Sequence, residues 1–360
     1  MSLHIDLKHR FRDFALDLDF EVPEGITVLF GRSGSGKSTV IRAIAGLFKP
    51  DHARISLDGR VLCDSEAKLF LPPHKRRVGT IFQDARLFPH LTVAQNLDFG
   101  RRFSRRDVPE REVAQMVEML GIGALLERRP AGLSGGEQQR VAIGRALLSG
   151  AELILADEPL AALDEGRKAE ILPYFERLRD EIAIPVLYVS HSPAEVARLA
   201  TTVIALEAGR VIGQGAADLV LSDPAVLPVG TAGAGALLRA TVHAHHEDGL
   251  TELSAGGAAL FLPHLETPVG HLVRLRIAAQ DVMLSLERPT GLSALNILSG
   301  VVSQISPTQG AGVLIVLDTD AGRVLSQVTR RSVAALNLRE GVRCHAVIKT
   351  VSIARDNIGA

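Results

Sequence analysis

Residues 31–38 read Gly31-Arg32-Ser33-Gly34-Ser35-Gly36-Lys37-Ser38 and match the pattern G-x-x-x-x-G-K-[ST]. A run at residues 26–30 that is apolar except for Thr27 precedes this stretch, as expected of a buried strand. After it, apolar residues recur at helical spacing at Ile41, Ile44, Ala45 and Phe48, and Pro50 ends the predicted helix. The stretch therefore predicts a phosphate-binding loop between a strand and a helix.

The residue types in this loop suit a bound nucleotide. Glycines let successive backbone N–H groups turn toward an anion, and the following helix adds the positive end of its dipole. Lys37 carries a positive charge for the β- and γ-phosphates, and Ser38 offers a hydroxyl to Mg²⁺. We therefore expect ATP to bind at Gly31, Arg32, Ser33, Gly34, Ser35, Gly36, Lys37, Ser38 and Thr39.

Two acidic residues follow a second apolar run. Residues 153–156 are apolar, and Asp157 and Glu158 come next. Carboxylates at the end of a buried strand cost free energy unless they bind something. Beside a phosphate loop, Asp157 is expected to hold Mg²⁺, and Glu158 to polarise the water that attacks the γ-phosphate. The alternative is a strand end whose carboxylates simply meet solvent.

A third motif lies between these two. Residues 133–140 read Leu133-Ser134-Gly135-Gly136-Glu137-Gln138-Gln139-Arg140. Ser134 is suited to cap a helix, and the two glycines open the backbone at the helix N-terminus. Such an N-terminus is suited to an anion.

This octet resembles the signature of the ABC transporter ATPases, and the resemblance covers about residues 1–230. It implies an α/β P-loop NTPase with a mixed core sheet and a helical subdomain at about residues 84–150. It also implies a homodimer that encloses two ATP molecules. In that dimer Ser134, Gly135, Gly136 and Glu137 of one subunit close on the ATP held by the other.

The same resemblance assigns roles to single residues. Gln83 is implied to link the nucleotide and its Mg²⁺ to the transmembrane partner, and His191 to contact the γ-phosphate. Asp164 lies in the implied dimer loop, and Phe11 is the expected aromatic partner of adenine, with Phe14 as its rival. Lys37, Gln83, Glu158 and His191 thus form the expected catalytic set, and Ser38, Gln83 and Asp157 the expected Mg²⁺ set.

The C-terminal third has a different pattern. Small residues at 230–236 predict a linker, and short strands with glycine turns follow. We expect a first β segment at residues 231–290 and an all-β, OB-like barrel domain at residues 291–360. The predicted strands are residues 239–243, 260–262, 272–277, 282–286, 301–305, 313–318, 324–328 and 343–351.

This tail carries a second resemblance, to the Mop-like (TOBE) domain fused to the ATPases of molybdate importers. The residues behind it are Ser293-Ala294-Leu295-Asn296-Ile297-Leu298, Val328-Thr329-Arg330-Arg331-Ser332, Leu336-Asn337-Leu338 and Ala346-Val347-Ile348-Lys349-Thr350-Val351-Ser352. Ser293, Asn296 and Lys349 offer donors for a molybdate or tungstate ion. Leu295 stands where many such tails carry an arginine, so a tail that serves only dimerisation stays open.

Composition limits the remaining classes. Lys and Arg total 40 against 41 Asp and Glu, so the net charge is −1, without the basic excess of a nucleic-acid binder. Cys63 and Cys344 lie far apart and form no zinc or disulfide pattern, which favours a reducing compartment. There is no apolar run of about 18 residues, so any membrane work requires a separate partner.

Together the two resemblances imply the ATP-hydrolysing subunit of a bacterial molybdate or tungstate importer, and the tail resemblance implies feedback inhibition by oxyanion bound there. Its implied partners are a permease that contacts residues 83–93 and, indirectly, a periplasmic solute-binding protein. Its implied location is the cytoplasmic face of the inner membrane, as a peripheral subunit. The alternatives are the same role for sulfate, iron or another solute, a non-transport ABC ATPase, and an oxyanion sensor.

Overall fold

The computed structural model describes residues 2–102, 108–161, 163–181, 184–226, 233–308, 310–353 and 357–359. The chain divides into two compact units. The first contains Met1–His191 and Leu199–Gln214, and the second contains Ser192–Arg198 and Gly215–Ala360. Part of the predicted linker, residues 230–232, lies outside the described residues. The predicted boundaries at residues 230 and 290 stay predictions.

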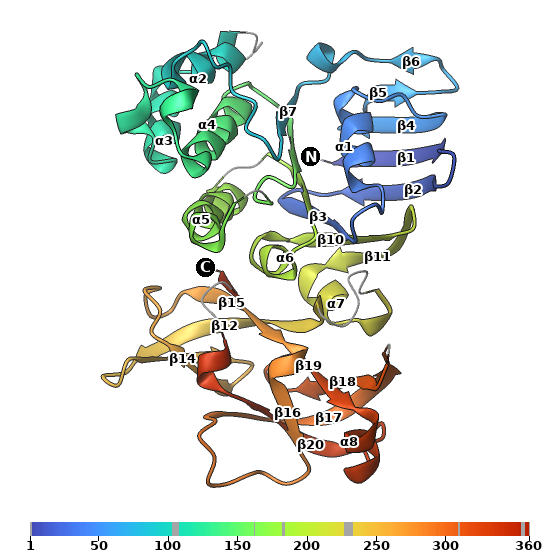
Figure 1. The fold of residues 1–360 in the computed structure, drawn as a ribbon, viewed down its shortest axis with the longest axis vertical. Coiled ribbons are helices and arrows are strands. Elements are labelled where there is room, and N and C mark those ends of the chain that lie inside the picture. Colours follow the sequence, from blue (N-terminus) through green and yellow to red (C-terminus); the bar gives the residue numbers. More distant parts are fainter. Residues whose placement is uncertain are drawn as a thin grey trace. The chain divides into compact units, whose positions relative to one another are not determined.

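The first unit is built on an eleven-stranded sheet with the order β6-β5-β4-β1-β2-β11-β10-β3-β9-β8-β7 (Figure 1). One part of the sheet is antiparallel and the other is parallel. The predicted mixed core sheet is therefore confirmed. The strands are β1 (Leu3–Arg10), β2 (Ala15–Val22), β3 (Ile26–Gly31), β4 (His52–Leu57), β5 (Arg60–Asp64), β6 (Leu69–Phe70), β7 (Val78–Ile81), β8 (Leu153–Asp157), β9 (Val186–Ser190), β10 (Thr202–Glu207) and β11 (Arg210–Ala216).

The sequence predicts the burial patterns of two strands in this sheet, β2 and β3. In β2 the acidic residues are exposed, whereas Leu16, Leu18, Phe20 and Val22 are buried, so the predicted alternation is confirmed. Every residue of β3 is buried, including Thr27, as its mostly apolar run predicts. Because β9 and β10 pair with β3 on its two sides, the strand that leads into the phosphate loop lies inside the sheet.

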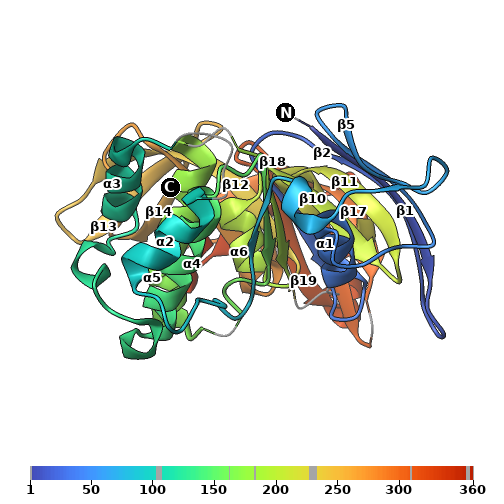
Figure 2. The ribbon, with the colours of Figure 1, turned by 90° about the horizontal axis from the view of Figure 1, so that it is seen from above.

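The helices of this unit fall into two groups. Helix α1 (Lys37–Ala45) contacts β3 and β8, whereas α2, α3, α4 and α5 gather on the other side of the unit (Figures 1 and 2). The bounds of the second group are α2 (Val93–Arg102), α3 (Glu110–Met119), α4 (Gly135–Leu147) and α5 (Glu165–Glu181). Three of these helices, α2, α3 and α4, lie in the predicted helical subdomain.

The second unit contains two antiparallel five-stranded sheets, ordered β14-β13-β12-β15-β21 and β16-β20-β17-β18-β19. Its strands are β12 (Gly235–His245), β13 (Leu250–Ala255), β14 (Ala258–Pro263), β15 (Leu272–Ala278), β16 (Val282–Ser285), β17 (Asn296–Pro307), β18 (Gly312–Thr319), β19 (Gly322–Thr329), β20 (Arg343–Ile348) and β21 (Ile358–Gly359). Its helices are α6 (Pro193–Leu199), α7 (Ala217–Leu221) and α8 (Arg330–Ala335).

One hydrophobic core serves both sheets of this unit. It includes Leu253 and Leu260 from the first sheet and Ile315 and Ala346 from the second. The β fold predicted for the tail is confirmed, and β20 ends at Ile348, three residues before the predicted end. The chain after it forms a 3₁₀ turn at Thr350–Ser352.

Helix α1 ends earlier than the sequence pattern predicts. Gly46 has a φ of +78°, a left-handed conformation that favours glycine, and it stops the helix before Phe48 and Pro50. Arg76 stabilises the C-terminal end of α1 at this position. Its fully buried guanidinium donates from Nη1 to the carbonyls of Ala43 and Ile44, both at 2.8 Å. These carbonyls belong to the last turn, where helices are short of donors, and Ala43 also accepts from the Gly46 N–H.

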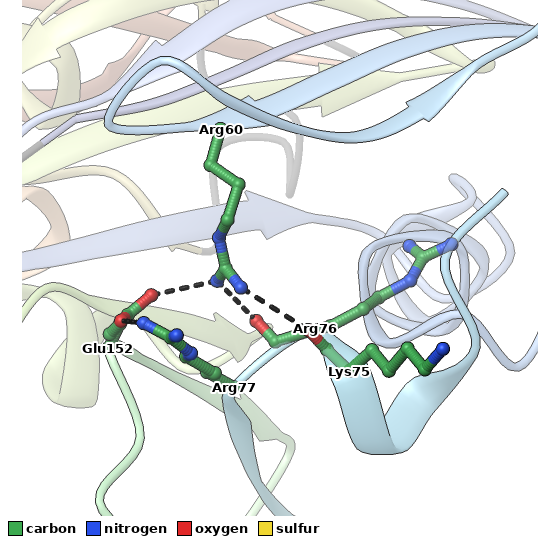
Figure 3. Close-up of polar contacts among 5 residues, drawn as sticks. All are labelled: Arg60, Lys75, Arg76, Arg77 and Glu152. Carbon is green, nitrogen blue, oxygen red and sulfur yellow. Dashed lines mark hydrogen bonds and ion pairs between the residues drawn. The ribbon is translucent and has the colours of Figure 1, made fainter. Parts of the chain in front are cut away.

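A second arginine joins separate parts of the unit (Figure 3). Arg60, on β5, donates to the carbonyls of Lys75 and Arg76 at 3.2 and 2.8 Å. It also donates to Glu152 Oε2 at 2.7 Å, and the other oxygen of Glu152 accepts from Arg77. The antiparallel arm of the sheet is thereby fixed to the segments that enter β7 and β8.

We expect Arg76→Met to lower the free energy of unfolding by about 3 kcal/mol, because the variant removes the guanidinium donors to the carbonyls of Leu71, Ala43 and Ile44. Arg77→Met is the matched control, and its loss should stay below about 1 kcal/mol, since Arg77 makes a partly exposed ion pair. Chemical denaturation followed by circular dichroism measures both. Equal losses in the two variants would contradict a special role of Arg76.

Candidate functional site

The phosphate loop depends on glycine at two positions. Gly36 has a φ of +102°, and a Cβ atom there would come within 2.3 Å of Leu16 Cδ2. A Cβ atom on Gly31 would come within 2.4 Å of the Leu206 carbonyl oxygen. The loop can therefore lie this close to its neighbours only because both residues lack side chains. Helix α1 begins directly after it, at Lys37.

The Lys37 side chain folds back onto its own loop. Its Nζ donates to the carbonyls of Gly31 and Arg32, both at 2.8 Å. Burial lowers the pKa of Lys37, and the carboxylates of Glu158 and Asp157 partly oppose that shift. An ammonium group held in this way adds positive charge at the phosphate loop.

Ser38 and Asp157 meet although they are 119 residues apart in the chain. Ser38 Oγ donates to Asp157 Oδ1 at 2.9 Å. Burial raises the pKa of Asp157, against the lowering effects of the Ser38 hydrogen bond, Arg42 and Lys37. A hydroxyl and a carboxylate are oxygen ligands of the kind that Mg²⁺ prefers. The residues expected to hold Mg²⁺ from β8 and α1 therefore lie together.

Glu158 adopts an uncommon backbone conformation. Its φ is +46°, and its N–H donates to the Val189 carbonyl at 3.2 Å. The side chain points to His191, whose Nδ1 lies 3.4 Å from Glu158 Oε2. Non-glycine residues in this region carry backbone strain, which is frequent at reaction centres. Two residues from the ends of β8 and β9 are thus brought into contact.

Lys37, Ser38, Asp157 and Glu158 line two hollows, and His191 is in the lining of neither. A cavity of about 370 Å³ is lined by Phe11, Phe14, Ser33, Gly34, Gly36, Lys37, Ser38, Thr39 and Glu158. A second hollow of about 480 Å³ includes Gln83 together with Ser38, Asp157 and Glu158. The structure therefore places Gln83 beside the residues expected to bind Mg²⁺. Gly31, Arg32 and Ser35 belong to the same loop, although they do not appear in the lining.

Both candidate aromatic residues line the first cavity. Phe11 is 36% exposed, whereas Phe14 packs against the core of the unit. Their ring centroids lie 6.1 Å apart at an interplanar angle of 29°. The more exposed ring of Phe11 is better suited to a planar ligand, and Phe14 supports the phosphate loop near Gly36.

The predicted N-cap at Ser134 is confirmed. Ser134 Oγ accepts from the Glu137 N–H at 3.3 Å, and Glu137 Oε2 accepts from the Ser134 N–H at 2.7 Å. This capping box lowers the pKa of Glu137, mainly through the Ser134 backbone hydrogen bond. Neither Ser134 nor Gly135, Gly136 or Glu137 lines the two hollows around Lys37 and Asp157.

Helix α4 also holds the segment after β7, which sequence reasoning missed. Gln139 Nε2 donates to the Phe82 carbonyl at 3.2 Å, directly before Gln83. Arg145 donates to the carbonyls of Ala85 and Arg86 at 3.1 and 2.8 Å. Burial lowers the pKa of Arg145. The signature octet contained Gln139, but no sequence pattern indicated which loop it would reach.

Asp164 has a local structural function. Its Oδ1 accepts from the Arg167 N–H at 3.0 Å, at the start of α5, and its Oδ2 lies 3.3 Å from Arg167 Nε. Asp164 therefore caps α5 in this structure. Its role in a dimer loop stays a prediction.

The three candidate oxyanion residues lie in different environments. Asn296 is fully buried, and its amide accepts from the Phe261 N–H at 2.6 Å and donates to the Phe261 carbonyl at 2.9 Å. Ser293 and Lys349 are exposed. Because Asn296 pairs with Ile348, the start of β17 and the end of β20 bring these positions to one end of the sheet. Leu295 is 51% exposed there.

Within the described ranges, each helix is too short or too polar to cross a lipid bilayer.

The comparisons with known proteins agree with this geometry. A family model described as "ABC transporter" matches residues 16–161, and a "TOBE domain" model matches residues 292–354. The Molybdenum import ATP-binding protein ModC of Mesorhizobium japonicum is 50% identical over 362 residues, covering 100% of this chain and 98% of the relative. The protein of the same name from Rhizobium meliloti is 50% identical over 357 residues, covering 98% of this chain and 99% of the relative.

Solved structures give the same picture for the first part of the chain. The structure titled cbiO1 from Clostridium perfringens, part of the ABC transporter complex cbiONQ, has a TM-score of 0.53 at 27% identity. It covers 61% of this chain and 90% of that one. A dimeric bacterial ABC transporter cassette, MJ0796, has a TM-score of 0.50 at 28% identity. The match covers 60% of this chain and 99% of the cassette.

We expect Asp157→Asn to stabilise the protein without ligands at neutral pH. Because the folded state raises the pKa of Asp157, it binds the proton more tightly than the unfolded chain does, and stability falls as pH rises through that range. The amide removes this dependence, and its Mg²⁺ affinity should fall by at least roughly tenfold. Thermal unfolding at several pH values, with and without Mg²⁺ and ATP, measures both effects. Asp320→Asn, at an exposed position, is the control and should change neither.

Proposed function

The chain belongs to the ABC transporter ATPases, among the molybdenum import ATP-binding proteins, and we propose that it energises molybdate or tungstate uptake through a separate permease. It is a transport ATPase of an importer. The observation that carries the proposal is the convergence of Lys37, Ser38, Asp157, Glu158 and His191 on one site.

ATP would bind with its phosphates along the loop from Gly31 to Thr39. The loop supplies backbone N–H groups and the N-terminus of α1, and Lys37 supplies the charge for the β- and γ-phosphates. The adenine would stack on Phe11, which lines the same cavity. The cavity therefore offers an aromatic surface at one part and cationic and N–H groups at another.

Ser38, Asp157 and Gln83 are the residues we assign to Mg²⁺. Their hydroxyl, carboxylate and amide oxygens fit the cation, and the buried carboxylate with a raised pKa indicates a site that gains from a positive charge. When bound, Mg²⁺ would neutralise charge on the β- and γ-phosphates. Ser38 and Asp157 are already held in place by their mutual hydrogen bond.

Glu158 is the residue we assign to the attacking water. Its carboxylate would accept a hydrogen bond from the water as the oxygen attacks the γ-phosphorus and the bond to ADP breaks. His191, next to Glu158, would donate to the γ-phosphate and hold the carboxylate in position. Lys37 would stabilise the negative charge on the transferred group.

We assign Ser134, Gly135, Gly136 and Glu137 to the ATP of a second copy of the chain. They lie outside the lining of both hollows in their own subunit, and they form a helix N-terminus suited to an anion. The dimeric cassette among the solved neighbours supports a homodimer, and we propose that each ATP in it touches both subunits. Asp164 would then contact the partner through its loop.

We assign the permease contact to residues 83–93. Gln139 and Arg145 of α4 donate hydrogen bonds to this segment. A displacement of the segment by the permease would therefore move both Gln83 and the N-terminal end of α4, which carries the signature residues. The chain would work at the cytoplasmic face of the inner membrane, and a periplasmic solute-binding protein would deliver the ion to the permease.

The tail is the proposed site of regulation by oxyanion. The matched TOBE domain and the names of the relatives support molybdate or tungstate as its ligand. Ser293 and Lys349 are exposed donors, and Asn296 would act by fixing the start of β17. Bound oxyanion would inhibit further ATP hydrolysis.

We expect Glu158→Gln to slow ATP hydrolysis by on the order of 100-fold or more, since the amide cannot take up a proton from water. ATP binding should persist, so the variant should accumulate as an ATP-bound dimer. Phosphate release and light scattering with Mg²⁺ and ATP measure the two effects. Glu207→Gln, at an exposed position, is the control. Hydrolysis at the wild-type rate in Glu158→Gln would refute this assignment.

We expect the full chain to bind molybdate and tungstate, and to bind sulfate far more weakly. Calorimetric titration of the full chain with each ion measures this. Lys349→Ala should weaken binding by roughly tenfold, because it removes a charged donor. Arg339→Ala, an exposed residue of the same unit, should not. A folded protein that binds none of the three ions would make the tail a structural domain and leave the ATPase assignment intact.

A further inference from the structure

Phe11 lies on the turn between β1 and β2 and lines the ATP cavity. Its N–H donates to the Phe14 carbonyl at 2.7 Å, which closes the turn. The side chain is 36% exposed, so core packing alone does not fix the ring. Other side chains must therefore set the direction in which the ring faces.

Three rings surround Phe11, and one of them stands apart in geometry. Phe14 and Phe48 lie nearly parallel to it, at centroid distances of 6.1 and 5.9 Å and angles of 29° and 18°. The His9 imidazole lies at 4.3 Å and 79° from Phe11, and at 4.8 Å and 85° from Phe48. His9 thus stands edge-on against both phenylalanines, which is a favoured arrangement of aromatic rings.

The His9 ring is itself held. Its Nδ1 lies 2.9 Å from Asp51 Oδ2, and its side chain is only 15% exposed. The same carboxylate oxygen accepts from the Arg10 N–H at 2.9 Å. The Asp51 carboxylate therefore contacts both the His9 imidazole and the backbone N–H of Arg10. The imidazole cannot turn away from Phe11 without losing the contact with Asp51.

This group of rings is also connected to the phosphate loop. Phe48 lies just after α1, and its N–H donates to the Arg42 carbonyl at 3.2 Å. Helix α1 begins at the phosphate loop and ends near Phe48. The position of the base-stacking ring relative to the phosphate site is thus set through His9, Phe48 and a helix.

We propose that His9, held by Asp51, is a positioning residue for nucleotide binding. It keeps the Phe11 ring facing the adenine at a fixed distance from the phosphate loop, and it does not touch the reacting atoms. The proposal rests on the proposed function, in which Phe11 stacks on adenine. It predicts that His9 affects recognition of the base but not recognition of the phosphates or the chemical step.

The test compares ATP with inorganic tripolyphosphate, which has phosphates but no base. We expect His9→Ala in the full chain to raise the KM for ATP about three- to fivefold, in line with the loss of one aromatic contact. The kcat should stay within about twofold, and the inhibition constant of tripolyphosphate against ATP hydrolysis should not change. Phe11→Ala should raise the KM for ATP about tenfold, the size of a lost base stack.

Further variants separate positioning from general stability. Asp51→Ala should act like His9→Ala, whereas Asp51→Asn should retain most of the wild-type KM, because its amide keeps an oxygen beside His9 and an acceptor for the Arg10 N–H. Adding His9→Ala to Phe11→Ala should raise the KM no further. His4→Ala, on the same strand, is the matched control and should behave as wild type.

Two results overturn the proposal while the stacking role of Phe11 stands. In one, Phe11→Ala raises the KM for ATP but His9→Ala does not. In the other, His9→Ala weakens tripolyphosphate as much as ATP, which indicates a general packing role. If Phe11→Ala leaves the KM unchanged, the assignment of adenine to Phe11 fails, and the role of His9 fails with it.

Discussion

The site depends on the burial of the Lys37 ammonium beside two carboxylates. Lys37 donates to two carbonyls of its own loop, and Asp157 and Glu158 partly offset the cost of removing its charge from water. This arrangement requires the loop to follow a buried strand and β8 to end at the same edge. The parallel pairing of β3, β9 and β8 meets that requirement, and the acidic residues then lie next to α1.

The sequence was most informative where one residue type has one physical purpose. The alternation in β2, the glycines of the phosphate loop and the cap at Ser134 all follow from local chemistry, and the structure has them as predicted. The contact between Ser38 and Asp157 agrees with the expectation that both residues serve one Mg²⁺ beside the phosphate loop. In each case a short pattern determines the geometry without knowledge of distant contacts.

Such patterns could not predict the side-chain contacts between residues that are distant in the chain. Arg76 reads as one of several basic residues, and only the fold shows that it is fully buried at the end of α1. Gln139 and Arg145 recur on α4 like ordinary helix residues, and their carbonyl partners lie about 60 residues earlier in the chain. Asn296 suggested an anion ligand because it is polar, whereas its amide is engaged with Phe261. The partners of these side chains depend on which elements the fold brings together.

The contact between Asn296 and Phe261 has a consequence for association between molecules. Strand β14 is an outer strand of its sheet, and outer strands present free N–H and carbonyl groups on which another chain can add a strand. At Phe261 both groups are taken by one side-chain amide, which acts as a one-residue substitute for a neighbouring strand. Asn296 therefore occupies the two groups at Phe261 to which a strand of a foreign chain would have to pair.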